Sequence, residues 1–147
     1  MLDTSVELEG DVLGKIETHL EDKRVGAIGT WGLLSENLNH FHEEAEFGEI
    51  DALQGYCFAF RRDILLKVGL MRECFRFYRI LDIDFSFQIK NHGYKILADG
   101  SLPMLRHTHR QWESLLEADR DELSKKNFKR FLVRWKNRTD LLVSRSI

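Results

Sequence analysis

The chain has 147 residues, enough for one compact hydrophobic core and too few for two ordinary domains. Hydrophobic residues make up 43% and charged residues 31%, values that argue against a disordered, collagen-like or coiled-coil chain. The net charge of −2 gives no general attraction to nucleic acid, and no apolar stretch has the length of a membrane-spanning helix. Two cysteines are too few for a disulfide framework, so we expect a reducing, cytoplasmic location.

The N-terminal half is expected to alternate between helices and strands. Leu13, Ile16 and Leu20 fall on one helical face, with Asp11 placed to cap the first turn. Residues 30–50 are rich in turn formers and acids and show neither a helical nor a strand period. Residues 50–61 are apolar on both faces. In chain order we predict a helix over 11–22, a strand over 25–29, a long mobile loop over 30–50, a central strand over 50–61 and a short helix over 63–68 that stops at Gly69.

Residues 81–93 carry conflicting local signals. Apolar and polar side chains alternate from Leu81 to Lys90, which is the period of a strand. However, the segment ends in a helix-stop signal at Gly93, and Asp82 suits the positive N-terminal end of a helix. We therefore predict a helix there. Short strands over 94–98 and 103–107 follow, and then a helix over 117–138 with an apolar stripe that includes Phe131 and Trp135.

Asp82 and Asp84 are the first candidates for chemistry. At a helix start, the two carboxylates are placed to face one cleft, one as a general base and one as a polar anchor. Carboxylates at helix starts are more often simple caps, so both interpretations stay open.

His107 and His109 are two residues apart at the end of the predicted strand over 103–107, and each is a candidate metal ligand. At most one of them is expected to bind a given metal ion, and the alternative for each is a hydrogen-bonded structural role. The short oxygen-rich run Asp3-Thr4-Ser5 is, taken alone, indistinguishable from a turn.

The C-terminal helix has a basic face that suits a phosphate backbone or an anionic membrane surface. The alternative is a solvated face whose counter-charge comes from the acidic segment 43–51. Its basic residues are Lys125, Lys126, Lys129, Arg130, Arg134, Lys136 and Arg138.

In their order along the chain, five segments resemble the second half of a nucleotide-sugar-dependent glycosyltransferase of the GT-A fold, close to glycosyltransferase family 2. They are LDTSVE, VGAIGTWGL, DALQGYCFAFRRDIL, FRFYRILDIDFSFQIKNHGYKI and LPMLRHTHRQW. The most specific piece is DIDFSFQIKNHGYKI, which is similar to the family's acidic helix followed by Gly-Tyr and a strand. The resemblance covers about residues 2–112 and favours the helix over 81–93.

The resemblance implies roles for individual residues. Asp82 matches the carboxylate that acts as catalytic base on the acceptor hydroxyl, with inversion at the anomeric carbon. Leu81 stands where the family often has an acid. Asp84 matches a position that supports the helix start or an acceptor hydroxyl, and Gly55 and Tyr56 match the strand that lines the acceptor side.

The same resemblance implies a metal site. Asp3 and Ser5 stand where the family carries its Asp-x-Asp, whose acids hold a divalent cation and the nucleotide. Ser5 replaces the last acid, and a neutral hydroxyl is a weaker ligand for Mg²⁺ or Mn²⁺. His107 matches a histidine that completes the metal site in some relatives, with His109 as the other candidate.

We therefore expect an α/β fold: a short mixed sheet flanked by helices, like the second half of a GT-A domain and without its N-terminal nucleotide-binding half. A partial GT-A-like domain is expected over 1–112 and a basic helical extension over 113–147. The expected function is inverting glycosyl transfer from a nucleotide sugar to a saccharide or lipid-linked acceptor, with Trp31 and Trp112 as stacking candidates. The alternative is a non-catalytic interaction module that folds alone or as a homo-oligomer.

Overall fold

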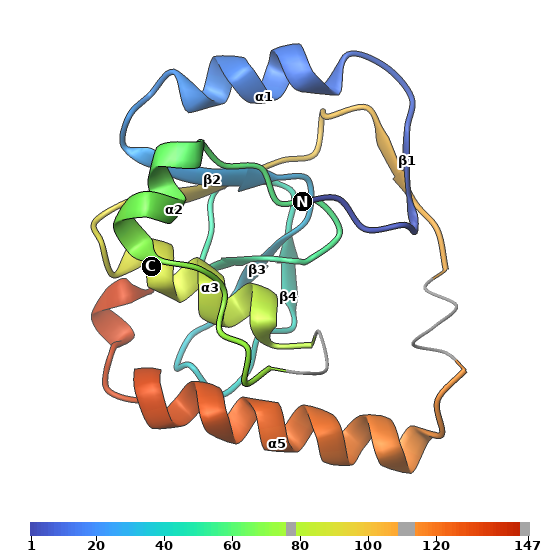
Figure 1. Ribbon diagram of the computed structural model, residues 1–147, viewed down its shortest axis with the longest axis vertical. Helices are drawn as coiled ribbons and strands as arrows, with labels where there is room; N and C mark the ends of the chain where they lie inside the picture. Colours follow the sequence, from blue (N-terminus) through green and yellow to red (C-terminus); the bar gives the residue numbers. More distant parts are fainter. Residues whose placement is uncertain (76–78, 109–113, 145–147) are drawn as a thin grey trace.

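The computed structural model describes residues 1–75, 79–108 and 114–144. It is a mixed α/β structure, which confirms the expected class. Helices and strands form layers, with α1 (Val12–Leu20), a small sheet, α3 (Leu81–Lys90) and α5 (Glu117–Trp135) following one another across the molecule (Figure 1). α2 (Arg62–Val68) packs beside α3 and ends at Gly69, whose φ of +85° suits the predicted stop.

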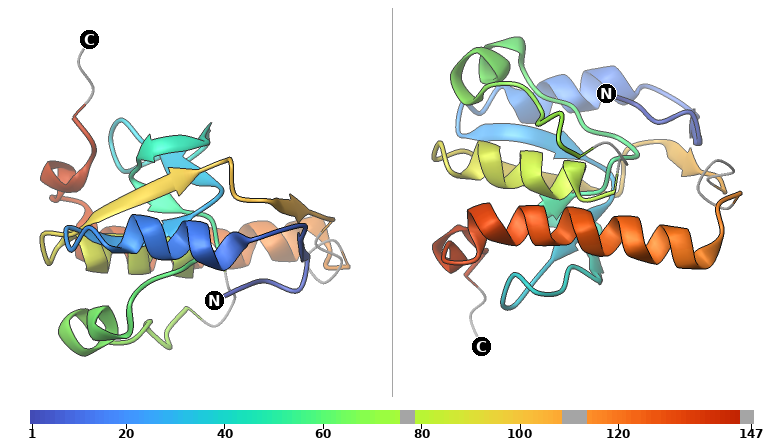
Figure 2. Two further views of the ribbon diagram at one scale, coloured as in Figure 1. Left: turned by 90° about the horizontal axis from the view of Figure 1, so that it is seen from above. Right: turned by 60° about the horizontal axis from the view of Figure 1, so that its bottom comes forward.

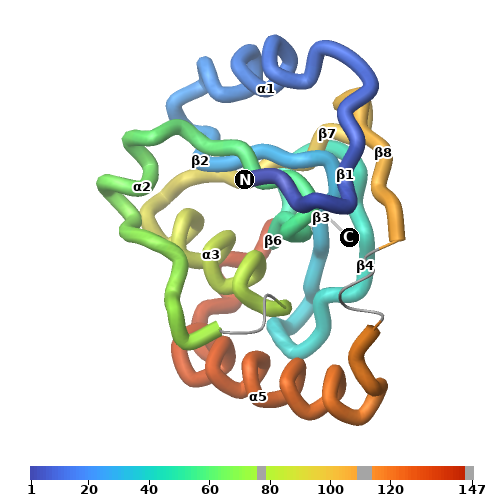
Figure 3. Tube along the Cα trace, turned by 45° about the vertical axis from the view of Figure 1, so that its right-hand side comes forward, coloured from blue at the N-terminus to red at the C-terminus, as the bar shows by residue number. Residues whose placement is uncertain are grey.

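The strands form three small sheets rather than one. In the first sheet, β7 pairs with β2 in parallel and with β5 in the antiparallel direction. In the second, β3 pairs antiparallel with β4 and β6. In the third, β1 pairs antiparallel with β8, and the two lie side by side in Figure 3. The strand bounds are β1 Val6–Leu8, β2 Val25–Gly29, β3 Gly32–Leu34, β4 Glu43–Ala45, β5 Phe47–Glu49, β6 Ala52–Leu53, β7 Lys95–Asp99 and β8 Met104–Arg106. A 3₁₀ turn over Thr139–Leu141 follows α5.

α3 is the central element, and its burial explains the misleading alternation in its sequence. Every residue from Ile83 to Lys90 is buried, because β2, β6 and β7 cover one side of the helix and α5 the other. Successive alternate residues of a helix lie about 200° apart, so the apolar residues are distributed over both covered sides. Gly26 permits the close approach of β2, since a Cβ there would lie 2.4 Å from Ile89 Cγ2. The predicted helix is confirmed.

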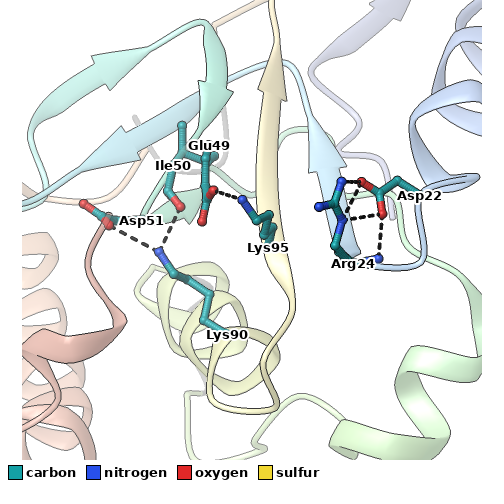
Figure 4. Close-up of polar contacts among 7 residues, drawn as sticks. All are labelled: Asp22, Arg24, Glu49, Ile50, Asp51, Lys90 and Lys95. Carbon is teal, nitrogen blue, oxygen red and sulfur yellow. Dashed lines mark hydrogen bonds and ion pairs between the residues drawn. The ribbon is translucent and has the colours of Figure 1, made fainter. Parts of the chain in front are cut away.

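The polar residues of α3 are buried with hydrogen-bond partners on the surrounding elements. Asp84 accepts from Trp135 Nε1 at 2.8 Å and pairs with Arg72 and Arg134 at 3.3 and 3.5 Å. At the other end of the helix, Lys90 Nζ donates to Ile50 O at 3.0 Å and pairs with Asp51 at 3.3 Å (Figure 4). These contacts attach α5, the segment after α2, and the start of β6 to one helix.

The prediction of a long loop over 30–50 is wrong. This segment contains β3, β4 and β5, and β3 pairs with both β4 and β6. Each strand is only three residues long, so no alternating period can become visible in the sequence. Between β3 and β4, Phe41 packs edge-on against Phe87 and Phe131, which holds the segment against α3 and α5. Figure 2 shows this stretch passing beside α5.

The continuous strand predicted over 50–61 is also wrong. Only Ala52–Leu53 forms a strand, a turn follows at Gly55 and Tyr56, and Cys57 and Ala59 make isolated bridges to Leu2 and Ile28. The residues are apolar on both faces because this irregular segment crosses the core between two hydrophobic clusters. Burial of an irregular segment therefore produces the pattern expected of a covered strand.

α5 docks on α3 through Phe131 and Trp135, as its apolar stripe predicts. The acids expected to balance its basic face have other partners, since Glu44, Glu49 and Asp51 pair with Arg106, Lys95 and Lys90. The pair between Glu49 and Lys95 joins β5 to β7 (Figure 4). Among the described residues, no helix has both the length and the apolar character needed to cross a membrane.

Replacing Asp84 with alanine is expected to lower the free energy of unfolding by about 3 kcal/mol, because a buried ion partner is lost and the indole N–H of Trp135 loses its acceptor. Urea denaturation measures the change. Asp140→Ala, which removes an exposed carboxylate paired with Arg138, is the control and should change stability little. Equal stabilities of the two variants would contradict the proposed central role of Asp84.

Candidate functional site

A pocket of about 890 Å³ opens at the N-terminal end of α3. It lies between the start of α3, the turn after β6, the segment before β4 and one face of α5. Its lining residues are Asp3, Leu33, Asn39, His40, Phe41, His42, Glu44, Gln54, Gly55, Tyr56, Arg79, Ile80, Asp82, Ile83, Ser124, Lys125, Phe128, Lys129 and Leu132. Four of the predicted site residues thus line one hollow: Asp82, Gly55, Tyr56 and Asp3.

Asp82 is held by the backbone on two sides. Its Oδ2 accepts from the amide of Gly55 at 2.9 Å, and its Oδ1 accepts from the amide of Ile83 at 2.9 Å. A carboxylate has about four acceptor positions, so each oxygen keeps room for another donor. The carboxylate is half-buried at the pocket wall and is therefore both oriented and accessible.

Burial raises the pKa of Asp82 from 3.8 to about 6. The hydrogen bonds from the amides of Ile83 and Gly55, and the charge of Arg79, oppose the rise. A carboxylate with this pKa is mostly ionised at pH 7 and is still basic enough to take a proton from a positioned hydroxyl. Asp82 thus has the electrostatic properties of a general base.

Ser86 sets the distance between Asp82 and Gly55. Its hydroxyl donates to Asp82 O at 2.8 Å and accepts from Leu53 N at 3.1 Å, and the residue is fully buried. The bridge ties β6 to the first turn of α3 directly beneath the carboxylate. Ser86 lies in the segment that resembles glycosyltransferases, but its bridging role was not predicted. The bridge joins Ser86 to Leu53, which is 33 residues away in the sequence.

Ile80, which precedes α3, is held in a strained conformation. Its φ is +76°, in the left-handed region that β-branched residues rarely adopt and that costs roughly 1–3 kcal/mol. Burial of its side chain against the cluster that includes Phe87 and Phe131 maintains this conformation. The turn at Ile80 starts α3 so that Asp82, two residues later, reaches the pocket.

Tyr56 is part of an aromatic group beside Asp82. Its ring meets Trp31 edge-on, with 5.5 Å between the ring centroids. The guanidinium carbon of Arg106 lies 5.1 Å from the ring centroid of Tyr56 and 5.3 Å from that of Trp31. Arg106 also pairs with Glu44 at 3.3 Å, which attaches the aromatic group to β4. Tyr56 lines the pocket, whereas Trp31 lies behind it as support.

Gly55 leaves the base of the pocket open. A Cβ at this position would lie 3.4 Å from Asp82 Oδ2, so a larger side chain would cover the carboxylate. This geometry agrees with the expectation that a small residue lets a ligand approach the backbone here.

Asp84 does not line the pocket. It is 1% exposed, and its carboxylate is occupied by Trp135, Arg72 and Arg134. It and Asp82 lie on different sides of α3, so the structure assigns the two acids different surroundings.

Among the residues expected to bind a divalent cation, Asp3, Ser5 and His107 lie within the described part of the chain. Asp3 lines the pocket, but its Oδ1 accepts from both the amide and the hydroxyl of Ser5, at 2.9 and 2.6 Å. His107 lies at the exposed surface of β1 and β8, where Nε2 is 2.8 Å from Glu7 Oε2. In the described ranges, no three His, Cys, Asp or Glu side chains are grouped to hold a metal ion. His109 and Trp112 lie outside the described residues.

No model of a known protein family matches the sequence, and a search of curated proteins finds no match. The class that the fold and the pocket define is a mixed α/β domain with a basic carboxylate at the start of a buried helix. Function is therefore inferred from the residues that line the pocket.

Replacing Ser86 with alanine should lower the free energy of unfolding by about 1–3 kcal/mol, because Leu53 N–H is left buried without an acceptor. Urea denaturation measures the loss, and amide exchange at Gly55 should accelerate as its bond to Asp82 loosens. Thr18→Ala removes an exposed helical hydroxyl and serves as the control. Unchanged exchange at Gly55 would show that Ser86 does not position Asp82.

The raised pKa of Asp82 predicts a specific pH dependence. Between about pH 4 and 6 the native state keeps a proton that the unfolded chain has released, so this group's contribution to stability falls as the pH rises. Asp82→Asn has no carboxyl group at this position, so its stability does not fall with pH for this reason. The free energy of unfolding of the variant relative to wild type should therefore increase from pH 4 to 6. Urea denaturation across this range and carboxyl ¹³C NMR are the measurements. A carboxyl that titrates near pH 4 would contradict the prediction.

Proposed function

We propose that this chain provides the acceptor site and catalytic base of an inverting glycosyl transfer from a nucleotide-activated sugar. The observation that carries the proposal is Asp82: a half-buried carboxylate, oriented by two backbone amides, in a pocket of about 890 Å³. This volume falls in the range of roughly 300–1,000 Å³ that is typical of small-molecule sites. The resemblance of residues 82–96 to the acidic helix and following strand of glycosyltransferases supports the same role.

The proposed role of Asp82 is proton transfer. A sugar hydroxyl is a poor nucleophile until a positioned base takes its proton. As the acceptor oxygen forms its bond to the anomeric carbon, its proton moves to the Asp82 carboxylate. The bond from that carbon to the nucleoside diphosphate breaks, and the leaving group keeps the electron pair. Attack opposite the leaving group inverts the anomeric centre.

The surroundings of Asp82 suit a saccharide acceptor. Tyr56 presents an aromatic ring supported by Trp31 and Arg106, and aromatic rings pack against the apolar faces of sugars. Gln54 and Glu44 lie in the same lining and are joined by a hydrogen bond of 2.9 Å, so polar atoms stand beside the ring. Gly55 leaves room for a hydroxyl to reach the carboxylate.

Titration with cellobiose, maltose and diacetylchitobiose, followed by ¹H–¹⁵N NMR, tests acceptor binding. We expect at least one saccharide to shift the amides of Gly55 and Tyr56, and Tyr56→Ala to weaken binding about tenfold through loss of ring contact. Asp82→Asn should retain binding. Where transfer from a nucleotide sugar is measured, Asp82→Asn should lower its rate by about 10²–10⁴-fold.

Leu66→Ala, at an exposed position on α2, is the control for the binding measurement and should leave the affinity unchanged. The proposal fails if no saccharide shifts the Gly55 and Tyr56 amides. It also fails if turnover survives in Asp82→Asn.

A further inference from the structure

We infer that the acceptor bound in this pocket carries a phosphate group, which Lys125 and Lys129 of α5 bind while the reacting hydroxyl reaches Asp82. The identity of the rest of the ligand rests on the proposed function. The phosphate site itself rests on the wall of the pocket that α5 provides.

α5 presents one continuous face to the pocket. Its lining residues follow the helical repeat, so they form a single strip along the helix. They are Ser124, Lys125, Phe128, Lys129 and Leu132. Lys125 and Lys129 are one turn apart, with Cβ atoms separated by roughly 5–6 Å, a spacing at which two ammonium groups can reach the same phosphate.

The two lysines bring positive charge to a pocket that the acids Asp3, Glu44 and Asp82 also line. Within the described residues, neither ammonium group has an ion pair or hydrogen-bond partner, and both residues are exposed. Glu44, the nearest acid on β4 to line the same pocket, is already paired with Arg106. Arg79 also lines this part of the pocket, and its guanidinium lies 3.5 Å from Ser124 Oγ.

Other basic residues of α5 have different surroundings, which makes the two lysines distinguishable. Arg134 pairs with Asp84, and Arg130 donates to Asn127 Oδ1 at 2.9 Å. Lys126 and Lys136 are exposed but do not line the pocket. Among the basic residues of α5, those that line the pocket are therefore Lys125 and Lys129. α5 also lies beyond the segments that resemble a glycosyltransferase.

The test compares glucose 6-phosphate, glucose and inorganic phosphate as probes in NMR titrations at about 50 mM salt. Glucose 6-phosphate should bind about tenfold or more tightly than glucose, because charge-assisted contacts to two lysines are added. Lys125→Gln/Lys129→Gln should abolish this difference. The matched control, Lys126→Gln/Lys136→Gln, removes the same charge from the same helix and should preserve it.

A second arm separates a lipid-borne phosphate from a soluble one. Sedimentation with phosphatidylglycerol-containing vesicles is compared with binding of glycerol 3-phosphate in solution. Dependence on Lys125 and Lys129 in either arm supports the inference, and the arm with the tighter binding identifies the source of the phosphate.

Equal affinities for glucose and glucose 6-phosphate overturn the inference and leave the proposed function intact. An equal loss in the control double variant also overturns it, because the effect would then be general electrostatic attraction. If glucose 6-phosphate and inorganic phosphate bind through the two lysines while no neutral saccharide shifts the Gly55 amide, the phosphate site stands and the proposed saccharide function fails.

Discussion

The structure depends on one constraint: α3 is buried from Ile83 to Lys90 and yet carries a polar residue at every second position. A buried polar group without a partner costs about 1–3 kcal/mol, so each of these residues must find its partner in a different neighbouring element. Ser86 bonds to β6, Gln88 to the backbone at the end of α2, and Lys90 to Asp51. The helix therefore fixes its surroundings through specific hydrogen bonds as well as through hydrophobic packing.

The same constraint gives two neighbouring acids different properties. Asp84 lies between Arg72, Arg134 and Trp135, where its charge is compensated and its position helps to dock α5. Asp82, two residues earlier, lies about 200° around the helix, where burial raises its pKa to about 6 although two backbone amides donate to it. The two acids differ because the side chain of Asp84 faces α5, whereas that of Asp82 faces the pocket.

Much of the pocket is assembled from segments that are distant in the chain. Asp3 accompanies Tyr56 because its amide donates to Tyr56 O at 2.8 Å, and Arg106 reaches Tyr56 and Glu44 from β8. The strands over 30–50 were missed because runs of three residues carry no detectable period, and their pairing depends on partners elsewhere. The surroundings of His107 show the same limit, since its ring pairs with Glu7 on the neighbouring strand while its amide donates to Ser5 O at 2.7 Å.

Local chemistry in the chain was enough to predict α1, β2, α2, α3 and α5, because amphipathic periods, caps and the stop at Gly69 act over a few residues. It was also enough to select Asp82 as a candidate, whereas Gly55 was selected only through the resemblance to glycosyltransferases. The packing of the layers decides whether Asp82 or Asp84 reaches the pocket and which lysines of α5 line it. Burial and electrostatic compensation come from side chains that are far away in sequence. Those long-range contacts separate a structural carboxylate from a candidate base.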